Sequence, residues 1–271
     1  NAQHAVEKND LKKVSMTDPE SRFMRSKNGI IELSYNPQIT TESNGFILAN
    51  DVCDSSSDIH QLQPLVLQTE QNLETIPENV KWSFDKGYYD SLNIKYLKDK
   101  KIDAYLQNQV KKNKSPYDKE NFTYNKRKDA YVCPEKKLLP FFSEHFDKLK
   151  NKTIRKYKGK DCQRCPKQKY CTKTKDGIRI VKMYPYEEER NALDKKMQTP
   201  KAKEIYKLRR QIVEPVFGDI KKNKGITTFL TRRLKTVKTE FNLICIANNI
   251  CRIQNKKQET SITIRNKHQN E

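Results

Sequence analysis

The sequence predicts an α/β fold, in which a mixed sheet is flanked by helices and interrupted by a basic, cysteine-containing insertion. Short apolar runs alternate with helical periodicity over residues 29–107. Helical periodicity returns over 187–253, after a Lys-rich stretch at 108–186. We therefore expect 29–107 and 187–253 to form one core, 1–28 to be a linker and 254–271 to be a disordered tail.

The core is expected to begin with a hairpin. Residues 30–41 and 46–52 have strand character, and Asn44-Gly45 lies in the short turn between them. An Asn-Gly pair between two such runs favours a hairpin because both residues accept a positive φ.

Helices and strands then alternate along the chain. The pattern predicts a helix start at 54–58, a helix over 59–73, a strand at 80–84, a helix at 91–100 and a strand at 102–106. Asp85 directly follows the strand predicted at 80–84, and open α/β sheets place their sites at the carboxyl ends of strands. Asp85 is therefore a candidate site residue, although a turn or helix-cap role is equally compatible with its position.

The charge is strongly asymmetric along the chain. The net charge is +21, yet residues 1–107 carry 12 Lys/Arg against 16 Asp/Glu. Residues 108–186 carry 23 against 8, and residues 187–271 carry 20 against 10. Such a field indicates a polyanionic partner, and a merely solvated basic surface explains it less well.

The remaining composition bears on the cellular compartment. No apolar run approaches the ~20 residues of a membrane span, and no export signal opens the chain. Seven cysteines without such a signal indicate a reducing cytosol, where clustered cysteines favour metal over disulfides. The chain starts with Asn1 rather than Met, which suggests a piece of a longer reading frame.

A second candidate site lies in YKLRRQIVEPVFGDIK, residues 206–221. On a helix, the apolar residues share one side, and Arg210, Glu214 and Lys221 follow its border. A carboxylate between two cations suits a site that handles phosphate and metal. The alternative is an ordinary amphipathic helix with an Arg–Glu pair worth ~0.2–0.5 kcal/mol.

These stretches together resemble a known family. WSFDKGYYD, then YKLRRQIVEPVFGDIK, then LICIANNICRI is similar to the DDE transposases of bacterial insertion sequences. TDPESRFMRSKNG, SYNPQI, YVCPEKKLL and CQRCPKQKYCT extend the likeness over nearly the whole chain, to about Ile253. The resemblance implies a ribonuclease-H-like core and metal-dependent DNA cleavage and strand transfer.

The resemblance also implies the roles of individual residues. Asp85 and Glu214 match the second and third acids of the family's triad, which hold Mg²⁺ or Mn²⁺. Arg210 and Lys221 match the basic residues that flank the third acid. Tyr206 matches the leading Tyr of that motif but stands one residue further from Arg210 than the common pattern has it.

The first acid of the triad has no match in this sequence. In the family it lies on the first strand in an Asp-Gly-Thr context, so we expect it to have been lost just upstream of Asn1. Asp18 is a poor substitute because Pro19 follows it in a non-strand context. Asp51 and Asp58 are possible helpers, although turn or cap roles suit them better.

Four cysteines in the insertion have the chemistry of a zinc site. Cys162, Cys165 and Cys171 are close in sequence, and Cys133 lies upstream; His145 is the alternative fourth ligand. Thiolates at this spacing suit tetrahedral Zn²⁺, and free thiols in a vestigial knuckle are the equally weighted alternative. Cys53, Cys245 and Cys251 are expected to be packed thiols of the core.

Three functions are compatible with these observations. The chain is expected to be a transposase catalytic domain, inactive or weak by itself, that acts on DNA as a homo-oligomer in the bacterial cytoplasm, with no membrane contact. The alternatives are a DNA-binding remnant without catalysis and a zinc-stabilised nucleic-acid-binding protein. The last leaves the ordered series of motifs unexplained.

Overall fold

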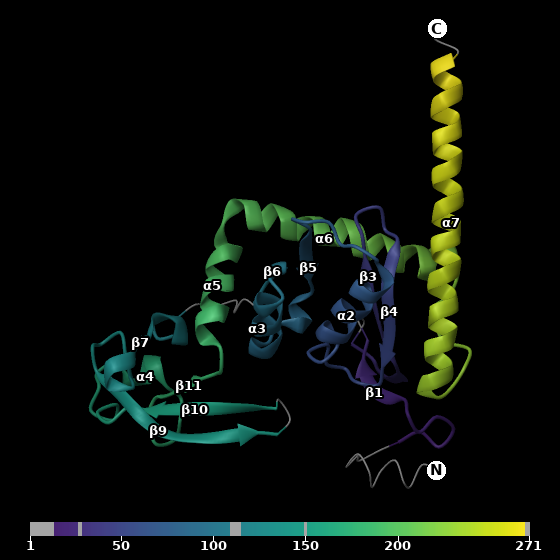
Figure 1. Ribbon diagram of the computed structural model, residues 1–271. Helices are drawn as coiled ribbons and strands as arrows, with labels where there is room; N and C mark the ends of the chain where they lie inside the picture. Colours follow the sequence, from purple (N-terminus) through teal and green to yellow (C-terminus); the bar gives the residue numbers. More distant parts are fainter. Residues whose placement is uncertain (1–13, 27–28, 109–114, 149–150, 269–271) are drawn as a thin grey trace. The chain divides into compact units, whose positions relative to one another are not determined.

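The computed structural model describes residues 14–26, 29–108, 115–148 and 151–268 (Figure 1). The chain divides into two compact units. Unit 1 comprises Asn1–Tyr88, Lys101–Leu106 and Met197–Glu271, and unit 2 comprises Tyr89–Lys100 and Gln107–Lys196.

Unit 1 contains three separate pairs of strands. β1 (Arg22–Arg25) pairs antiparallel with β2 (Ile31–Ser34), and β3 (Asn36–Thr41) pairs antiparallel with β4 (Ile47–Cys53). β5 (Lys81–Phe84) pairs parallel with β6 (Asp103–Leu106). The hairpin of β3 and β4 confirms the prediction, and Gly45 has the positive φ, 79°, that its turn needs.

The run 30–41, predicted as one strand, is two strands separated by Tyr35. Tyr35 is buried, and its hydroxyl donates to the Asp18 carboxylate at 2.8 Å. This hydrogen bond connects the run 30–41 to residues 1–28, which the sequence predicted to be only a linker. In the same region β1 pairs with β2. The sequence did not predict β1, because a strand four residues long is too short to give a clear period of two.

Three long helices belong mainly to unit 1. α2 (Leu62–Asn72) follows β4, and α6 (Pro200–Gly218) leads into a π turn at Asp219–Asn223. α7 (Leu234–His268) lies alongside β4. The sequence predicted disorder from 254 onward, whereas α7 continues to His268; no Gly or Pro interrupts that stretch.

The core of unit 1 lies between the β3–β4 hairpin and the ends of α6 and α7. Its buried members are Tyr35, Ile47, Val52, Val216, Ile220, Val237, Phe241 and Cys245. The residues from α7 recur every four positions, which is a spacing of one helix face.

Unit 2 is built on a curled antiparallel sheet with the strand order β11-β10-β9-β8-β7. The strands are β7 (Thr123–Asn125), β8 (Ala130–Val132), β9 (Leu138–Asp147), β10 (Lys152–Lys158) and β11 (Ile180–Met183). The helices are α3 (Ser91–Asp99), α4 (Gln168–Cys171) and α5 (Glu187–Gln198). A small core of Phe122, Tyr131, Leu139, Tyr157 and Val181 lies on this sheet.

The sequence did not predict this sheet. In β10, Lys152, Ile154 and Tyr157 are buried, and a β-bulge lies between Lys156 and Tyr157. The bulge shifts the alternation by one residue, so the run does not keep a period of two. A buried lysine conceals the pattern further; Lys152 is ion-paired with Asp90, which is also buried.

The observed fold is mixed α/β, as the sequence predicts. α3 belongs to unit 2, and the predicted division of the chain into domains stays a prediction. Within the described residues, no helix has both the length and the hydropathy that crossing a membrane requires.

Candidate functional site

Asp85 lies where the sequence predicts it, directly after β5. A short 3-10 turn, Lys86–Tyr88, follows it, and its carboxylate accepts a hydrogen bond from the Gly87 amide at 3.4 Å. The carboxylate also forms an ion pair with Arg209 of α6, with an N–O distance of 3.1 Å. The strand end and the long helix therefore meet at an acidic group.

Arg209, rather than Arg210, is the cation that reaches Asp85. The Arg209 side chain is only 14% exposed, and its guanidinium lies over the Tyr206 ring at 5.7 Å. Arg210 is exposed. The helical period is sufficient to identify Arg209 as the enclosed cation, because Arg209 shares a stripe with Val213 and Val216. The resemblance to the family indicated Arg210 instead.

Glu214 and Lys221 are both exposed. α6 runs without a break through Pro215 to Gly218, so the proline does not end the helix. Among the residues that the structure describes, no hydrogen bond or ion pair joins Glu214 to Asp85, and no three His, Cys, Asp or Glu side chains are arranged to hold a metal ion. The convergence of Asp85 and Glu214 stays a prediction.

Asp58, which the sequence suggested as a helper acid or, more readily, as a turn or cap residue, lies beside this site. It does not cap α2, which begins at Leu62. Its carboxylate instead accepts hydrogen bonds from Asn36 at 2.7 Å and from Gln38 at 2.9 Å. A Cβ placed on Gly87 would lie 2.4 Å from an Asp58 oxygen, so this carboxylate lies against the turn that follows Asp85.

Tyr88 joins this polar cluster to β3. Its hydroxyl donates a hydrogen bond to the side-chain oxygen of Gln38. Burial, followed by the negative charges of Asp58 and Asp85, raises the pKa of Tyr88 above its usual range. Tyr88 therefore stays neutral and acts as a donor at any physiological pH.

The other weighed carboxylates have structural partners. Asp18 is buried and accepts bonds from the Tyr35 hydroxyl and the Arg233 amide. Asp51 forms an ion pair with Lys238 at 2.6 Å. Neither group contacts Asp85 among the residues that the structure describes.

A large cavity of about 830 Å³ opens onto the core of unit 1. Asp58 and Lys221 lie in its wall, as do the strand residues Tyr35 and Asn36. The apolar part of the wall is formed by Phe217, Ile220, Ile226, Phe229, Phe241 and Ile244, among others. The core is thus open to solvent beside β3.

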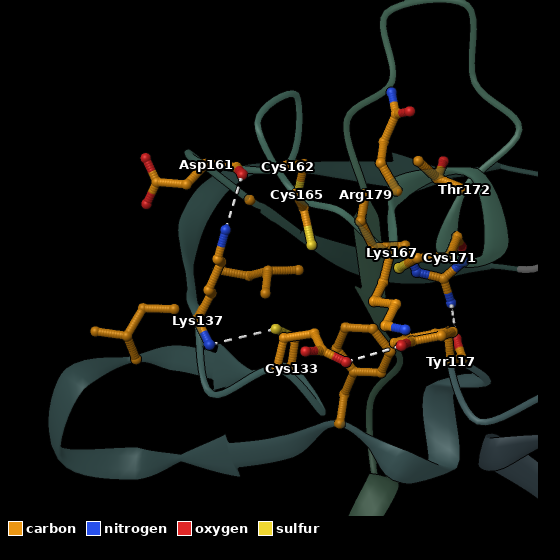
Figure 2. Close-up of a pocket in the computed structure, with 16 residues that line it drawn as sticks. Tyr117, Cys133, Lys137, Asp161, Cys162, Cys165, Lys167, Cys171, Thr172 and Arg179 are labelled. Carbon is orange, nitrogen blue, oxygen red and sulfur yellow. Dashed lines mark hydrogen bonds between the residues drawn. The ribbon is translucent and has the colours of Figure 1, made fainter.

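In unit 2, Cys133, Cys162, Cys165 and Cys171 line one small cavity of about 30 Å³ (Figure 2). Cys133 follows β8, Cys162 and Cys165 follow β10, and Cys171 ends α4. All four are half-buried and none forms a disulfide. His145 is not among the residues that line the cavity.

The cysteines predicted to be core thiols divide into two groups. Cys53 and Cys245 are buried, as expected, and burial raises the pKa of the Cys245 thiol to about 12. Cys251 is exposed on α7, so that part of the prediction is wrong.

Comparison with known proteins identifies the second half of the chain. Residues 132–254 match the family described as the transposase DDE domain. This stretch is therefore similar to the DDE domain of transposases, which supports the resemblance that the motifs indicated. It contains Glu214, Arg210, Lys221 and the four cysteines, and Asp85 lies before it. No curated protein and no solved structure gives a significant match.

Proposed function

We propose that the chain is the catalytic region of a transposase that cleaves DNA and transfers the cut strand with divalent metal ions. The observation that supports this most directly is the pairing of Asp85 at a strand end with Arg209 of α6, the helix that carries Glu214. The match of 132–254 to a transposase DDE domain supports the same reaction.

In this proposal, Asp85 and Glu214 hold Mg²⁺ or Mn²⁺, hard ions that prefer carboxylate oxygens. Bound metal would supply Lewis-acid stabilisation of the attacking and leaving oxygens of a phosphodiester. Arg210 and Lys221 offset phosphate charge next to Glu214. Arg209 keeps the Asp85 carboxylate neutralised and oriented.

We further propose that the first acid comes from a strand that inserts between β3 and β5 in a ribonuclease-H-like sheet. The β3–β4 and β5–β6 pairs are separate two-stranded sheets, so each of β3 and β5 has an unpaired edge among the described residues. Side chains, Tyr88 and Gln38, bridge β3 to the end of β5. Adjacent strands lie only about 4.8 Å apart, which leaves no room for two such side chains to meet end to end. The bridge therefore supports a separation of β3 from β5 that a further strand would fill.

The cavity beside β3 is a second argument for the proposal that a strand inserts there. It is open to solvent, and partly buried apolar side chains such as Phe217 and Ile226 line it. Asp58 lies in the same wall and is the alternative source of a third carboxylate. If the third carboxylate comes from an inserted strand, this chain by itself should not cut DNA. If it comes from Asp58, this chain by itself should cut.

The DNA is proposed to bind to unit 2 and the exposed cations of the insertion. Lys160, Arg164, Lys167, Lys169, Lys173 and Lys175 are all exposed around the cysteine cavity. Several acids of the unit are already paired, as in Lys126–Glu188 and Lys119–Glu187. We also propose that the active form is a homo-oligomer on DNA in the bacterial cytoplasm.

A nicking assay on supercoiled plasmid with Mg²⁺ or Mn²⁺ tests the proposal. We expect this chain to bind DNA without cutting it, and the longest polypeptide that its gene encodes to cut. Glu214→Gln should abolish that cutting. Glu204→Gln, an exposed acid on the same helix, is the matched control and should leave it unchanged.

Two results would count against parts of the proposal. Cutting by this chain alone that Asp58→Asn abolishes would assign the third acid to Asp58 and refute the inserted strand. A gene that encodes no further strand, with a chain that binds DNA but never cuts, would favour a DNA-binding remnant. The charge of 108–186 makes that remnant the second candidate.

A salt titration tests the DNA-binding part separately. Each phosphate contact should contribute about −0.9 to the slope of log affinity against log salt. Deleting 108–186 should flatten that slope markedly, because 23 of the 55 Lys/Arg lie there. An unchanged slope would show that the insertion is not the main DNA contact.

A further inference from the structure

The cavity of unit 2 that is lined by four thiols contains the donor set of a structural metal site, independently of the proposed DNA chemistry. Its thiols come from three separate segments: the turn after β8, the loop after β10 and the end of α4. All four are unoxidised and border the same small space. Four thiols around one cavity are the donor set of structural zinc.

The turn at Cys133 is shaped to present its sulfur. The Lys136 amide donates to the Cys133 carbonyl at 2.8 Å, and the Cys133 amide donates to the Lys137 carbonyl at 2.9 Å. The Lys137 amide then donates to the Cys133 sulfur at 3.3 Å. This N–H···S hydrogen bond holds the Cys133 sulfur beside the cavity.

The second turn presents two sulfurs together. The Cys165 amide donates to the Cys162 carbonyl at 3.1 Å, which closes the Cys-x-x-Cys loop. The Cys162 sulfur lies directly over Gly159, where an added Cβ would be only 2.3 Å away. The backbone at Gly159 thus forms a cradle that any other residue would fill.

Arg179 fixes the fourth cysteine. Its guanidinium donates to the Cys171 carbonyl at 3.0 Å and to the Tyr117 carbonyl at 3.1 Å. Cys171 and Arg179 both line the cavity, so the first of these bonds holds the end of α4 beside it.

As they stand, the four sulfurs are not gathered: no metal-ready group of three donors exists within the described residues. A cysteine side chain has a single torsion, so rotation about χ1 moves each sulfur without moving the backbone. The cavity of about 30 Å³ has room for a water molecule, which needs ~10–15 Å³ on the same measure, and therefore for a bare cation.

We propose that Cys133, Cys162, Cys165 and Cys171 rotate inward and bind one Zn²⁺ per chain, which ties the loop at 159–179 to the turn after β8. Binding releases the thiol protons, and the exposed lysines nearby offset the resulting negative charge. The small core of unit 2 explains the need, because few apolar residues hold this long loop.

Elemental analysis of the whole chain, purified under reducing conditions after addition of zinc chloride, tests the proposal. We expect one zinc per chain in the native protein and none in Cys165→Ser. The matched control, Cys251→Ser, removes an exposed thiol of α7 and should keep the full zinc content. Equal zinc in both variants would show adventitious binding and overturn the proposal.

A second variant keeps the test valid if Cys165→Ser fails to fold. Gly159→Ala leaves every thiol in place but fills the cradle of Cys162. Its zinc affinity, measured by competition with a chromogenic chelator, should fall roughly tenfold or more, as for other changes beside metal ligands. Native folded protein that binds no zinc, with all four thiols open to a thiol reagent, would refute the site.

Discussion

At the scale of single residues, the candidate site depends on one ion pair. Arg209 is largely enclosed and contacts the Asp85 carboxylate at 3.1 Å, whereas its neighbour Arg210 points into solvent. Replacement of the two arginines should therefore have unequal effects.

We expect Arg209→Met to lower the free energy of unfolding by roughly 1–2 kcal/mol, since it removes a charge-assisted hydrogen bond and a ring contact. Arg210→Met should change it by less than about 0.5 kcal/mol, as is usual for exposed positions. Urea denaturation of both variants gives the comparison. Equal losses would mean that the ion pair contributes nothing to stability.

Gly87 provides a second residue-scale prediction. Gly87→Ala would place a methyl group 2.4 Å from the Asp58 carboxylate and should cost about 1–3 kcal/mol through the forced shift. Gly218→Ala meets nothing within 4 Å at the end of α6 and should be neutral or stabilising. Thermal unfolding of the pair decides; a harmless Gly87→Ala would place Asp58 away from the turn.

The sequence predicted some of these residues but not others. Asp85 was predictable because a carboxylate directly after an apolar strand has a recognisable position. Asp58 was not, because its partners, Asn36 and Gln38, lie about twenty residues away and meet it only in the folded chain. Long-range hydrogen bonds of this kind leave no local pattern.

At the scale of elements, α7 holds the loop before it through one carboxylate. Glu240 accepts hydrogen bonds from the Leu230 amide at 2.8 Å, the Thr231 amide at 2.9 Å and the Thr231 hydroxyl at 2.6 Å. Burial acts to raise the pKa of Glu240, but these donors outweigh it and lower the pKa below 4.5. This carboxylate therefore stabilises the fold above its usual pKa and ceases to do so as the pH falls through its lowered value.

Glu240→Gln should cost about 1–2 kcal/mol at pH 7, because the amide accepts fewer of these bonds. It should also make stability less dependent on pH below 4.5. Urea denaturation at pH 7 and in mild acid measures both effects, with Glu204→Gln as the exposed control. If the two variants have the same acid profile, Glu240 does not anchor the loop.

Elements with one uninterrupted period were predictable, and the interrupted ones were not. The hairpin of β3 and β4, the strand β5 and the helices α2 and α3 follow from local patterns and turn residues. The sheet of unit 2 did not follow, because the bulge in β10 and the buried Lys152 break its alternation. Its strands are stabilised by pairing with one another rather than by local preference.

At the scale of the whole molecule, both units contain tyrosines whose pKa is raised above 10.0. Examples are Tyr35 and Tyr88 in unit 1, and Tyr131 and Tyr157 in unit 2. Burial is the largest cause in each, and neighbouring carboxylates add to it. The folded chain thus retains protons that the unfolded chain loses above pH 10.

Stability should consequently be unaffected by these groups below pH 10 and should decline as the pH rises beyond it. Circular dichroism and tyrosine absorbance, recorded together from pH 8 to about 12, should show unfolding and ionisation as one transition. Tyr131→Phe should make the decline less steep, whereas the exposed Tyr170→Phe should not. Tyrosine ionisation that precedes unfolding would contradict the assignment.

The edges of β3 and β5 that lack a partner strand among the described residues have a consequence for handling the protein. A strand edge with free backbone donors and acceptors pairs readily with an edge of another molecule, and sheets can then grow from chain to chain. The net charge of +21 opposes such contacts by mutual repulsion, which salt screens over about 8–10 Å. The purified chain should therefore stay in solution at low ionic strength and precipitate as salt is added. This is the reverse of the behaviour of proteins whose solubility increases with salt.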